Sequence, residues 1–210
     1  MIGRADFAAI ARWVEPNAKV LDLGCGDGSL LKYLKEARNA HGYGIEIADA
    51  NILACVEKNV NVIQMDLEAG LSGFESQSFD FVILSQTLQA MRNIELVVKE
   101  ILRVGKHGIV TIPNFGYWRR RFQVLQGHMP VSRDLPYQWY DTPNIHLCTF
   151  VDFEAFCRDH GVRILERHVM CDGEDVSLLP NLLGNLAVYR FEKEARGEGL
   201  EGVVPRKRGV

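Results

Sequence analysis

Val20-Leu21-Asp22-Leu23-Gly24-Cys25-Gly26-Asp27-Gly28 is the stretch of sequence that decides the fold. The apolar residues of 19–23 predict a short buried strand, and leucines at helical spacing predict a helix over 29–38. The alternating glycines between them allow a tight turn and let a ligand approach the backbone without meeting a Cβ atom. An ordinary strand-to-helix turn needs one glycine, so three indicate a ligand-binding turn at the end of a strand.

Further strands and helices alternate along the chain. Residues 43–47, 60–65, 79–84 and 109–112 predict strands, and an apolar stripe over 94–102 predicts one of the helices between them. This alternation is typical of a mostly parallel sheet with helices on both faces. Two later strands, 162–170 and 186–191, predict an antiparallel addition at the C-terminal end, which makes seven strands in all.

The glycine-rich turn does not fit a dinucleotide-binding site. Ser29 stands where the fingerprint G-x-G-x-x-G requires its third glycine. Asp22 and Asp27 place negative charge beside the turn, which would repel a pyrophosphate but suits a ligand with an ammonium and a sulfonium group. The turn resembles the glycine-rich motif of class I S-adenosylmethionine-dependent methyltransferases. The resemblance implies the Rossmann-like fold of that class.

Other residues extend this predicted site along the same edge of the sheet. Glu46 ends the second strand, where a carboxylate can accept hydrogen bonds from both ribose hydroxyls. Asp66 follows the third strand, and the resemblance implies that it contacts the adenine amino group with Leu67 against the ring; capping a helix is the alternative role for Asp66. The predicted cofactor-binding residues are Asp22, Gly24, Cys25, Gly26, Gly28, Glu46, Ile47, Asp66, Leu67 and Ser85. S-adenosylhomocysteine is expected as product or ligand.

The sequence contains one candidate for an acid–base group and no predicted metal site. Methyl transfer from a sulfonium is an in-line displacement that can depend largely on positioning, so no nucleophile is required of the protein. His146 is a weak candidate for a general base. A histidine that holds its own loop by hydrogen bonds is at least as good an interpretation. The six histidines form no close helical pair, so we expect no metal.

Composition excludes several classes of protein. The net charge of −3 gives no reason to expect nucleic acid as a partner. The five scattered cysteines include no C-x-x-C motif and fit a reducing compartment. No apolar run approaches the ~20 residues of a membrane span, and the N-terminus lacks the apolar core of a signal peptide. We therefore expect a cytoplasmic protein without a membrane partner.

Residues 113–148 interrupt the alternation of strands and helices with aromatic residues, prolines and the run Arg119-Arg120-Arg121. Tryptophan, tyrosine and arginine are enriched at protein interfaces. The segment can be an inserted lid over the sheet edge or a surface for a protein partner. We expect one domain over 1–191 that includes this segment, followed by a disordered tail over 192–210.

Several motifs together resemble the MetW family of methionine-biosynthesis proteins over about residues 1–191. They are 21–28, Tyr43-Gly44-Ile45-Glu46, Leu88-Gln89-Ala90, Pro113-Asn114-Phe115-Gly116-Tyr117-Trp118-Arg119, Thr142-Pro143-Asn144-Ile145-His146 and Pro180-Asn181-Leu182-Leu183-Gly184. The tail with Arg206-Lys207-Arg208 lies outside the resemblance.

The MetW resemblance implies a bacterial protein that works with a homoserine O-acyltransferase (MetX). It also implies a methyltransferase-like fold with no established methyl acceptor. Asp22, Gly24, Gly26, Glu46 and Asp66 match the cofactor motif, and no catalytic residue is carried over. The expected function is therefore an S-adenosylmethionine-binding partner or activator of MetX, and the alternative is a freestanding methyltransferase acting on a small molecule.

Overall fold

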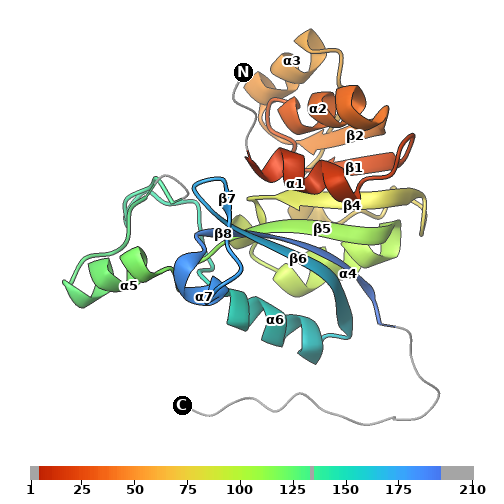
Figure 1. Ribbon diagram of the computed structural model, residues 1–210. Coiled ribbons are helices and arrows are strands. Elements are labelled where there is room, and N and C mark those ends of the chain that lie inside the picture. Colours follow the sequence, from red (N-terminus) through yellow and green to blue (C-terminus); the bar gives the residue numbers. More distant parts are fainter. Residues whose placement is uncertain (1–4, 133–134, 195–210) are drawn as a thin grey trace.

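The computed structural model describes residues 5–132 and 135–194, which form an eight-stranded sheet flanked by helices (Figure 1). The elements in chain order are α1 (Ala5–Trp13), β1 (Lys19–Leu23), α2 (Ser29–Arg38), β2 (His41–Glu46), α3 (Asp49–Glu57), β3 (Asn61–Gln64), the 3-10 helix η1 (Leu67–Ala69), β4 (Phe79–Ser85), the 3-10 helix η2 (Leu88–Ala90), α4 (Ile94–Val104), β5 (Gly105–Pro113), α5 (Trp118–Leu125), α6 (Phe150–Asp159), β6 (Val162–Cys171), β7 (Glu174–Asp175), α7 (Pro180–Leu183) and β8 (Leu186–Lys193).

The strand order is β3-β2-β1-β4-β5-β8-β6-β7. The first five strands in this order run parallel, and β8 runs antiparallel to both β5 and β6. This confirms the predicted fold class. The eighth strand, β7, was not predicted, because two residues that pair with Met170 and Cys171 of β6 are too short to show a hydrophobic period.

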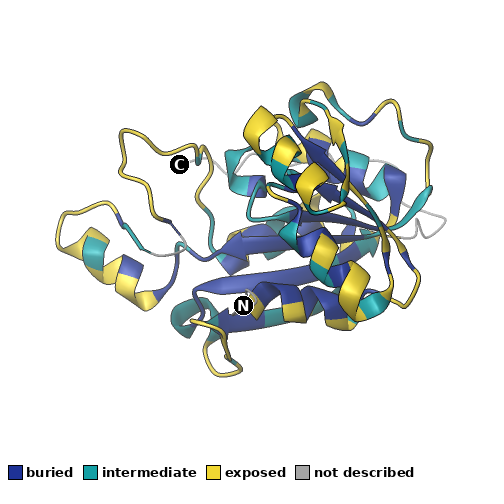
Figure 2. Ribbon diagram, turned by 90° about the horizontal axis from the view of Figure 1, so that it is seen from above, coloured by how far each residue is buried: buried dark blue, intermediate teal, exposed yellow. Residues whose placement is uncertain are grey.

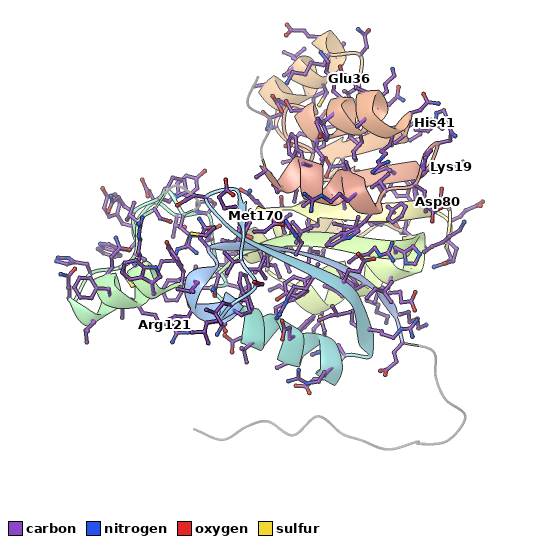
Figure 3. The ribbon with its side chains drawn as sticks, in the orientation of Figure 1. Lys19, Glu36, His41, Asp80, Arg121 and Met170 are labelled. Carbon is purple, nitrogen blue, oxygen red and sulfur yellow. The ribbon has the colours of Figure 1, made fainter. Side chains whose placement is uncertain are left out.

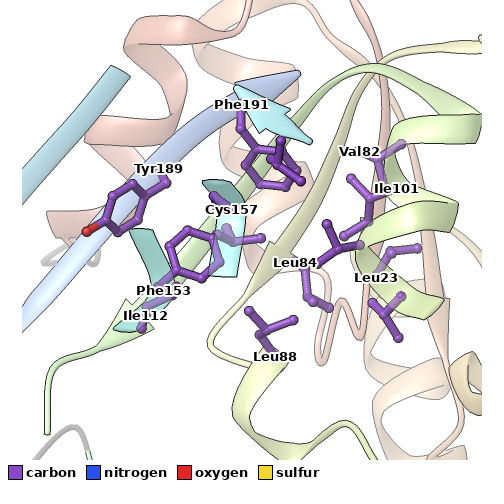
Figure 4. Packing of buried hydrophobic residues seen from close by; sticks show 14 of the residues in the cluster. Leu23, Val82, Leu84, Leu88, Ile101, Ile112, Phe153, Cys157, Tyr189 and Phe191 are labelled. Carbon is purple, nitrogen blue, oxygen red and sulfur yellow. The ribbon is translucent and has the colours of Figure 1, made fainter. Parts of the chain in front are cut away.

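The sheet separates two hydrophobic clusters. Alternate residues of one strand point to opposite faces, so Leu21 of β1 joins the cluster beneath α4 and α6, whereas Val20 joins the cluster beneath α1 and α2. β4 divides in the same way, with Val82 and Phe81 on opposite faces. Figure 4 shows the first cluster, in which Phe153 of α6 packs among the strands. Burial on both faces explains why these strands read as nearly continuous apolar runs.

Several strand boundaries differ from the sequence predictions by one to four residues, and those of β5 and β8 are described here. β5 begins at Gly105 rather than at 109, because Gly105 and His107 pair with Phe79 and Phe81 of β4 although this part of the strand lacks an apolar pattern. β8 continues to Lys193, so residues 192–193, which were expected to belong to a disordered tail, are part of the sheet: Arg163 pairs with Glu192, and Val162 with Lys193. Residues 195–210, including 206–208, lie outside the described residues. None of the helices in the described ranges has the length and apolar character needed to cross a bilayer.

The N-terminal ends of three strands are tied together by Asp80 of β4. Its carboxylate accepts a hydrogen bond from the backbone N–H of Lys19 at 2.8 Å and one from Nζ of Lys106 at 2.8 Å. Lys19 and Asp80 are labelled at this end of the sheet in Figure 3. The hydrogen bond from Lys106 holds the pKa of the Asp80 carboxyl below its usual range.

We expect Asp80→Asn to lower the free energy of unfolding at pH 7 by about 0.5–1 kcal/mol, because both bonds to a charged acceptor are weakened. A carboxyl with a lowered folded-state pKa stabilises the protein above its unfolded pKa, and this contribution is lost as the pH falls through the folded-state pKa. The difference between wild type and variant should therefore shrink toward pH 3. Urea denaturation at several pH values measures it, with exposed Glu36→Gln in α2 as control; a constant difference would contradict the assignment.

Candidate functional site

The glycine-rich turn lies between β1 and α2 and contains three left-handed residues. Gly24, Gly26 and Gly28 have φ angles of 69°, 54° and 74°, which residues with a Cβ rarely adopt. The backbone N–H groups of Gly24 and Cys25 both donate to the carbonyl of Ile45, at 2.8 and 3.0 Å. These two bonds fix the turn against β2, so the site depends on the pairing of β1 with β2.

The surroundings of the three glycines show which part of the turn is open. A Cβ on Gly24 would lie 3.1 Å from Oγ1 of Thr87, and one on Gly28 would lie 3.0 Å from Sγ of Cys55. A Cβ on Gly26 would meet nothing within 4 Å. Gly26 is therefore the point at which the backbone itself faces open space.

Glu46 lies beside the same point, with only 8% of its surface exposed. Its Oε2 accepts a hydrogen bond from the Gly26 N–H at 2.9 Å, and its Oε1 accepts bonds from the N–H groups of Ile47 and Ala48, both at 2.9 Å. A carboxylate offers roughly four acceptor positions. Three are used by backbone, so binding of two ribose hydroxyls, as predicted from the sequence, requires Gly26 to give up its bond or the carboxylate to turn. Ile47 itself is exposed.

The two aspartates of the motif have different surroundings. Asp22 is buried at the end of β1. Asp27 is exposed and paired with Lys58, which follows α3, and it also accepts bonds from Ser29. The hydrogen bond from Lys58 lowers the pKa of the Asp27 carboxyl. Lys58 therefore neutralises much of the negative charge of Asp27. The sequence pattern did not predict that this lysine contacts the turn.

The remaining predicted residues follow β3 and β4. Asp66 caps η1, because its Oδ1 accepts the Glu68 N–H at 2.9 Å. This is the role that the sequence left as an alternative. Leu67 packs partly buried against the sheet. Ser85 ends β4, and its Oγ lies 3.5 Å from Oδ2 of Asp6, a buried acid in the first turn of α1.

Asp6 had not been predicted as part of this edge. Its carboxylate also accepts a hydrogen bond from the side chain of Gln86 at 3.3 Å. The only signal in the sequence is an acid in the first turn of an otherwise apolar helix face, and this does not reveal that α1 reaches the end of β4. Asp6 therefore adds a third buried acid, after Asp22 and Glu46, to the edge that carries the turn.

Cys25 and Cys55 lie beneath the turn with their sulfur atoms 3.8 Å apart. Cys55 also donates to the carbonyl of Gly26 at 3.2 Å. Burial raises the pKa of both thiols. Cys25 rests on Gly44 of β2, where an added Cβ would come within 2.3 Å of the sulfur. Gly44 is thus required for the position of the turn.

His146 lies elsewhere, at a cleft of about 450 Å³ between α4 and α6. Its backbone N–H donates to the carbonyl of Gln89 at 2.9 Å, and its Nε2 is 3.5 Å from the carbonyl of Arg92. Gln89, Arg92 and the apolar residues Phe153 and Phe156 line the same cleft. These contacts agree with the interpretation that His146 holds its own loop by hydrogen bonds. His146 also lines the cleft. In the described part of the chain, no three His, Cys, Asp or Glu side chains are grouped so as to hold a metal ion.

Comparison with known proteins identifies the family. The model of the family described as "Methionine biosynthesis protein MetW" matches residues 4–191. The chain belongs to the MetW family. A bifunctional methionine biosynthesis protein MetXA/MetW of Rhodopirellula baltica is 33% identical over 206 residues, which cover 91% of this chain and 33% of that protein. This MetW chain therefore spans about a third of the length of that relative.

Solved structures agree on the fold of this MetW chain. An S-adenosylmethionine-dependent methyltransferase of Mesorhizobium loti superposes with a TM-score of 0.65 at 14% identity, covering 91% of this chain and 99% of that one. A TehB-like S-adenosylmethionine-dependent methyltransferase of Corynebacterium glutamicum gives a TM-score of 0.62 at 15% identity, covering 91% and 89%. The chain has the class I methyltransferase fold.

We expect the buried thiols of the turn to resist alkylation in the folded protein. The thiolate is the reactive form, and burial both raises the pKa and blocks access. A short pulse of iodoacetamide at pH 7.5, followed by peptide mass spectrometry, should label half-buried Cys171 well before Cys25 and Cys55. All five cysteines should react after unfolding in urea. Equal labelling of Cys25 and Cys171 in the folded state would contradict this description of the turn.

Proposed function

We propose that this MetW chain binds S-adenosylmethionine at the glycine-rich turn and acts as a partner of the homoserine O-acyltransferase MetX. The partnership rests on the relative from Rhodopirellula baltica, whose name, bifunctional methionine biosynthesis protein MetXA/MetW, joins the two proteins. Proteins that are fused in one organism commonly act together when they are separate chains in another. The methionine-biosynthesis family description supports the same pathway.

The turn supports the ligand assignment through its chemistry. Gly26 exposes backbone at the open point, buried Asp22 supplies negative charge for a cationic amino-acid end, and Glu46 supplies acceptors for a sugar. Helix N-termini favour anions, but Asp22 and Glu46 counter that preference here. A ligand with an ammonium and a sulfonium therefore fits better than a phosphate. S-adenosylhomocysteine keeps the same contacts except those of the sulfonium charge.

A freestanding small-molecule methyltransferase is the second candidate. The cleft that His146 lines favours it, because Leu88 and Gln89 on its wall follow β4 directly and Pro113 ends β5. An acceptor held there would lie near the edge that carries the turn. His146 could take a proton from such an acceptor, and Gln89 could orient it.

Calorimetry with S-adenosylmethionine, S-adenosylhomocysteine and NAD tests the ligand. We expect heat with the first two and none with NAD. Gly44→Ala should weaken binding by about tenfold or more, that is by at least ~1.4 kcal/mol, because its Cβ displaces Cys25 in the turn. Gly73→Ala is the matched control, since its Cβ meets nothing within 4 Å. Thermal unfolding should show both variants folded, and equal affinity of Gly44→Ala and wild type would refute the site.

Co-purification with the acyltransferase of the same organism tests the partnership. We expect a stable complex and faster acyl transfer to homoserine in the presence of this chain. The rate should be measured with and without it at equal acyltransferase concentration. Absence of both complex and rate change would remove the proposal. In that case labelled S-adenosylmethionine with a metabolite extract should give a labelled product that His146→Ala reduces, if the second candidate is right.

A further inference from the structure

Residues 114–147 form an arm that leaves the sheet after β5 and returns before α6. We call this segment the aromatic arm; residues 133–134 within it are not described. It extends away from the sheet and carries α5 (Figure 1). Figure 2, which gives the same arm from a second direction, shows it largely exposed, in contrast to the buried strands. The arm is thus a projecting surface and not part of the core.

The root of the aromatic arm is firmly held. The Arg120 side chain is 1% exposed, and its Nη1 donates to the Asn114 carbonyl at 2.5 Å while its Nη2 donates to Ser132 Oγ at 3.1 Å. Arg121, labelled in Figure 3, donates from Nε to the Gly116 carbonyl at 2.5 Å. A buried guanidinium is costly unless its hydrogen bonds are made. These contacts therefore fix where the arm leaves the body.

Beyond the root, the aromatic arm presents large apolar side chains to solvent. Leu125, Trp139 and Tyr140 are 82%, 72% and 71% exposed. Other large apolar side chains of the arm that are exposed are Trp118, Phe122, Val124, Met129, Tyr137, Ile145 and Leu147. Exposed apolar residues on this scale indicate an interaction site, and tryptophan and tyrosine are the residues that dominate binding energy at protein interfaces.

The charge of the aromatic arm indicates the kind of partner. The arm contains four arginines and two aspartates in a chain whose net charge is −3. Arg119 and Arg121 are exposed among its apolar side chains, and the Arg119 guanidinium lies 5.4 Å from the centre of the Trp118 ring. A two-fold contact that pairs this surface with itself would bring together two surfaces that both carry these positive charges. A different protein with an apolar groove and an acidic rim fits the surface better.

We propose that the aromatic arm is the surface by which this chain docks on the acyltransferase, an inference that rests on the proposed function. Two binding partners that are joined in one polypeptide, as the name of the relative from Rhodopirellula baltica implies, are kept at a high effective concentration. Wherever MetX and MetW are separate chains, their association depends on the surfaces that they present to each other. The rigid root and exposed tryptophan, tyrosine and arginine side chains of the arm supply that surface without a large ordering cost.

The experiment uses the full chain, the acyltransferase of the same organism and a pair of matched double variants. Leu125→Ser with Trp139→Ser removes two exposed apolar groups of the aromatic arm, and Leu53→Ser with Val56→Ser removes two from α3, which are 64% and 61% exposed. We expect the arm variant to bind the acyltransferase about 100-fold more weakly, as loss of hot-spot residues does, and the α3 variant to bind like wild type. Both should keep wild-type affinity for S-adenosylmethionine, which shows that they are folded.

Charge reversal gives an independent readout. Arg119→Glu should weaken the complex, and the salt dependence of its association rate should become smaller or change sign. Equal binding of the arm and α3 variants, with a wild-type complex present, would overturn the docking assignment and leave the proposed function standing. Absence of any wild-type complex would overturn both. An arm-dependent dimer of this chain alone, seen by light scattering, would overturn the assignment in favour of a second copy.

Discussion

The site depends on a single junction between β1 and β2. The carbonyl of Ile45 accepts both N–H groups at the start of the glycine-rich turn, and the neighbouring Glu46 carboxylate accepts the N–H of Gly26. These bonds exist only in the observed register, in which Leu23 pairs with Ile45. A slip of one residue would turn Glu46 to the other face of the sheet. The sheet pairing therefore determines where the start of the turn and the Glu46 carboxylate lie.

The same junction limits how much a sugar can contribute to binding. Hydrogen bonds to a charged group are worth about 1.5–3 kcal/mol when their alternative is water. The Glu46 carboxylate already holds three backbone donors, so a ribose diol must replace at least one of them. The net gain is then a difference between two sets of good hydrogen bonds. Affinity would have to come mainly from the adenine and the cationic amino-acid end, where buried Asp22 lies.

The sequence predicts those features of the structure whose pattern lies within one short segment of the chain. The strand, glycines and helix of 19–38 lie within 20 residues and carry their own hydrophobic period, and β1 and α2 have the predicted bounds. Asp6 beside Ser85 and Lys58 beside Asp27 are contacts between distant segments, which no local pattern encodes. β7 and the first residues of β5 form strand because they pair with the neighbouring strands β6 and β4. The predicted ligand contacts, including those of Asp66 and Leu67, stay predictions.

The two proposed binding surfaces use different parts of one sheet edge. The turn follows β1 and the aromatic arm follows β5, with β4 between these strands in the sheet. The end of β4 is fixed to both sides: Thr87 packs against Gly24, and the Gln86 N–H donates to Thr111 of β5 at 2.6 Å. Because the turn and the arm share no residue, a ligand and a protein partner do not compete for the same atoms. In the proposed arrangement, a methyltransferase-like fold keeps its ligand site and also docks on another enzyme, because the docking uses only the segment inserted after β5.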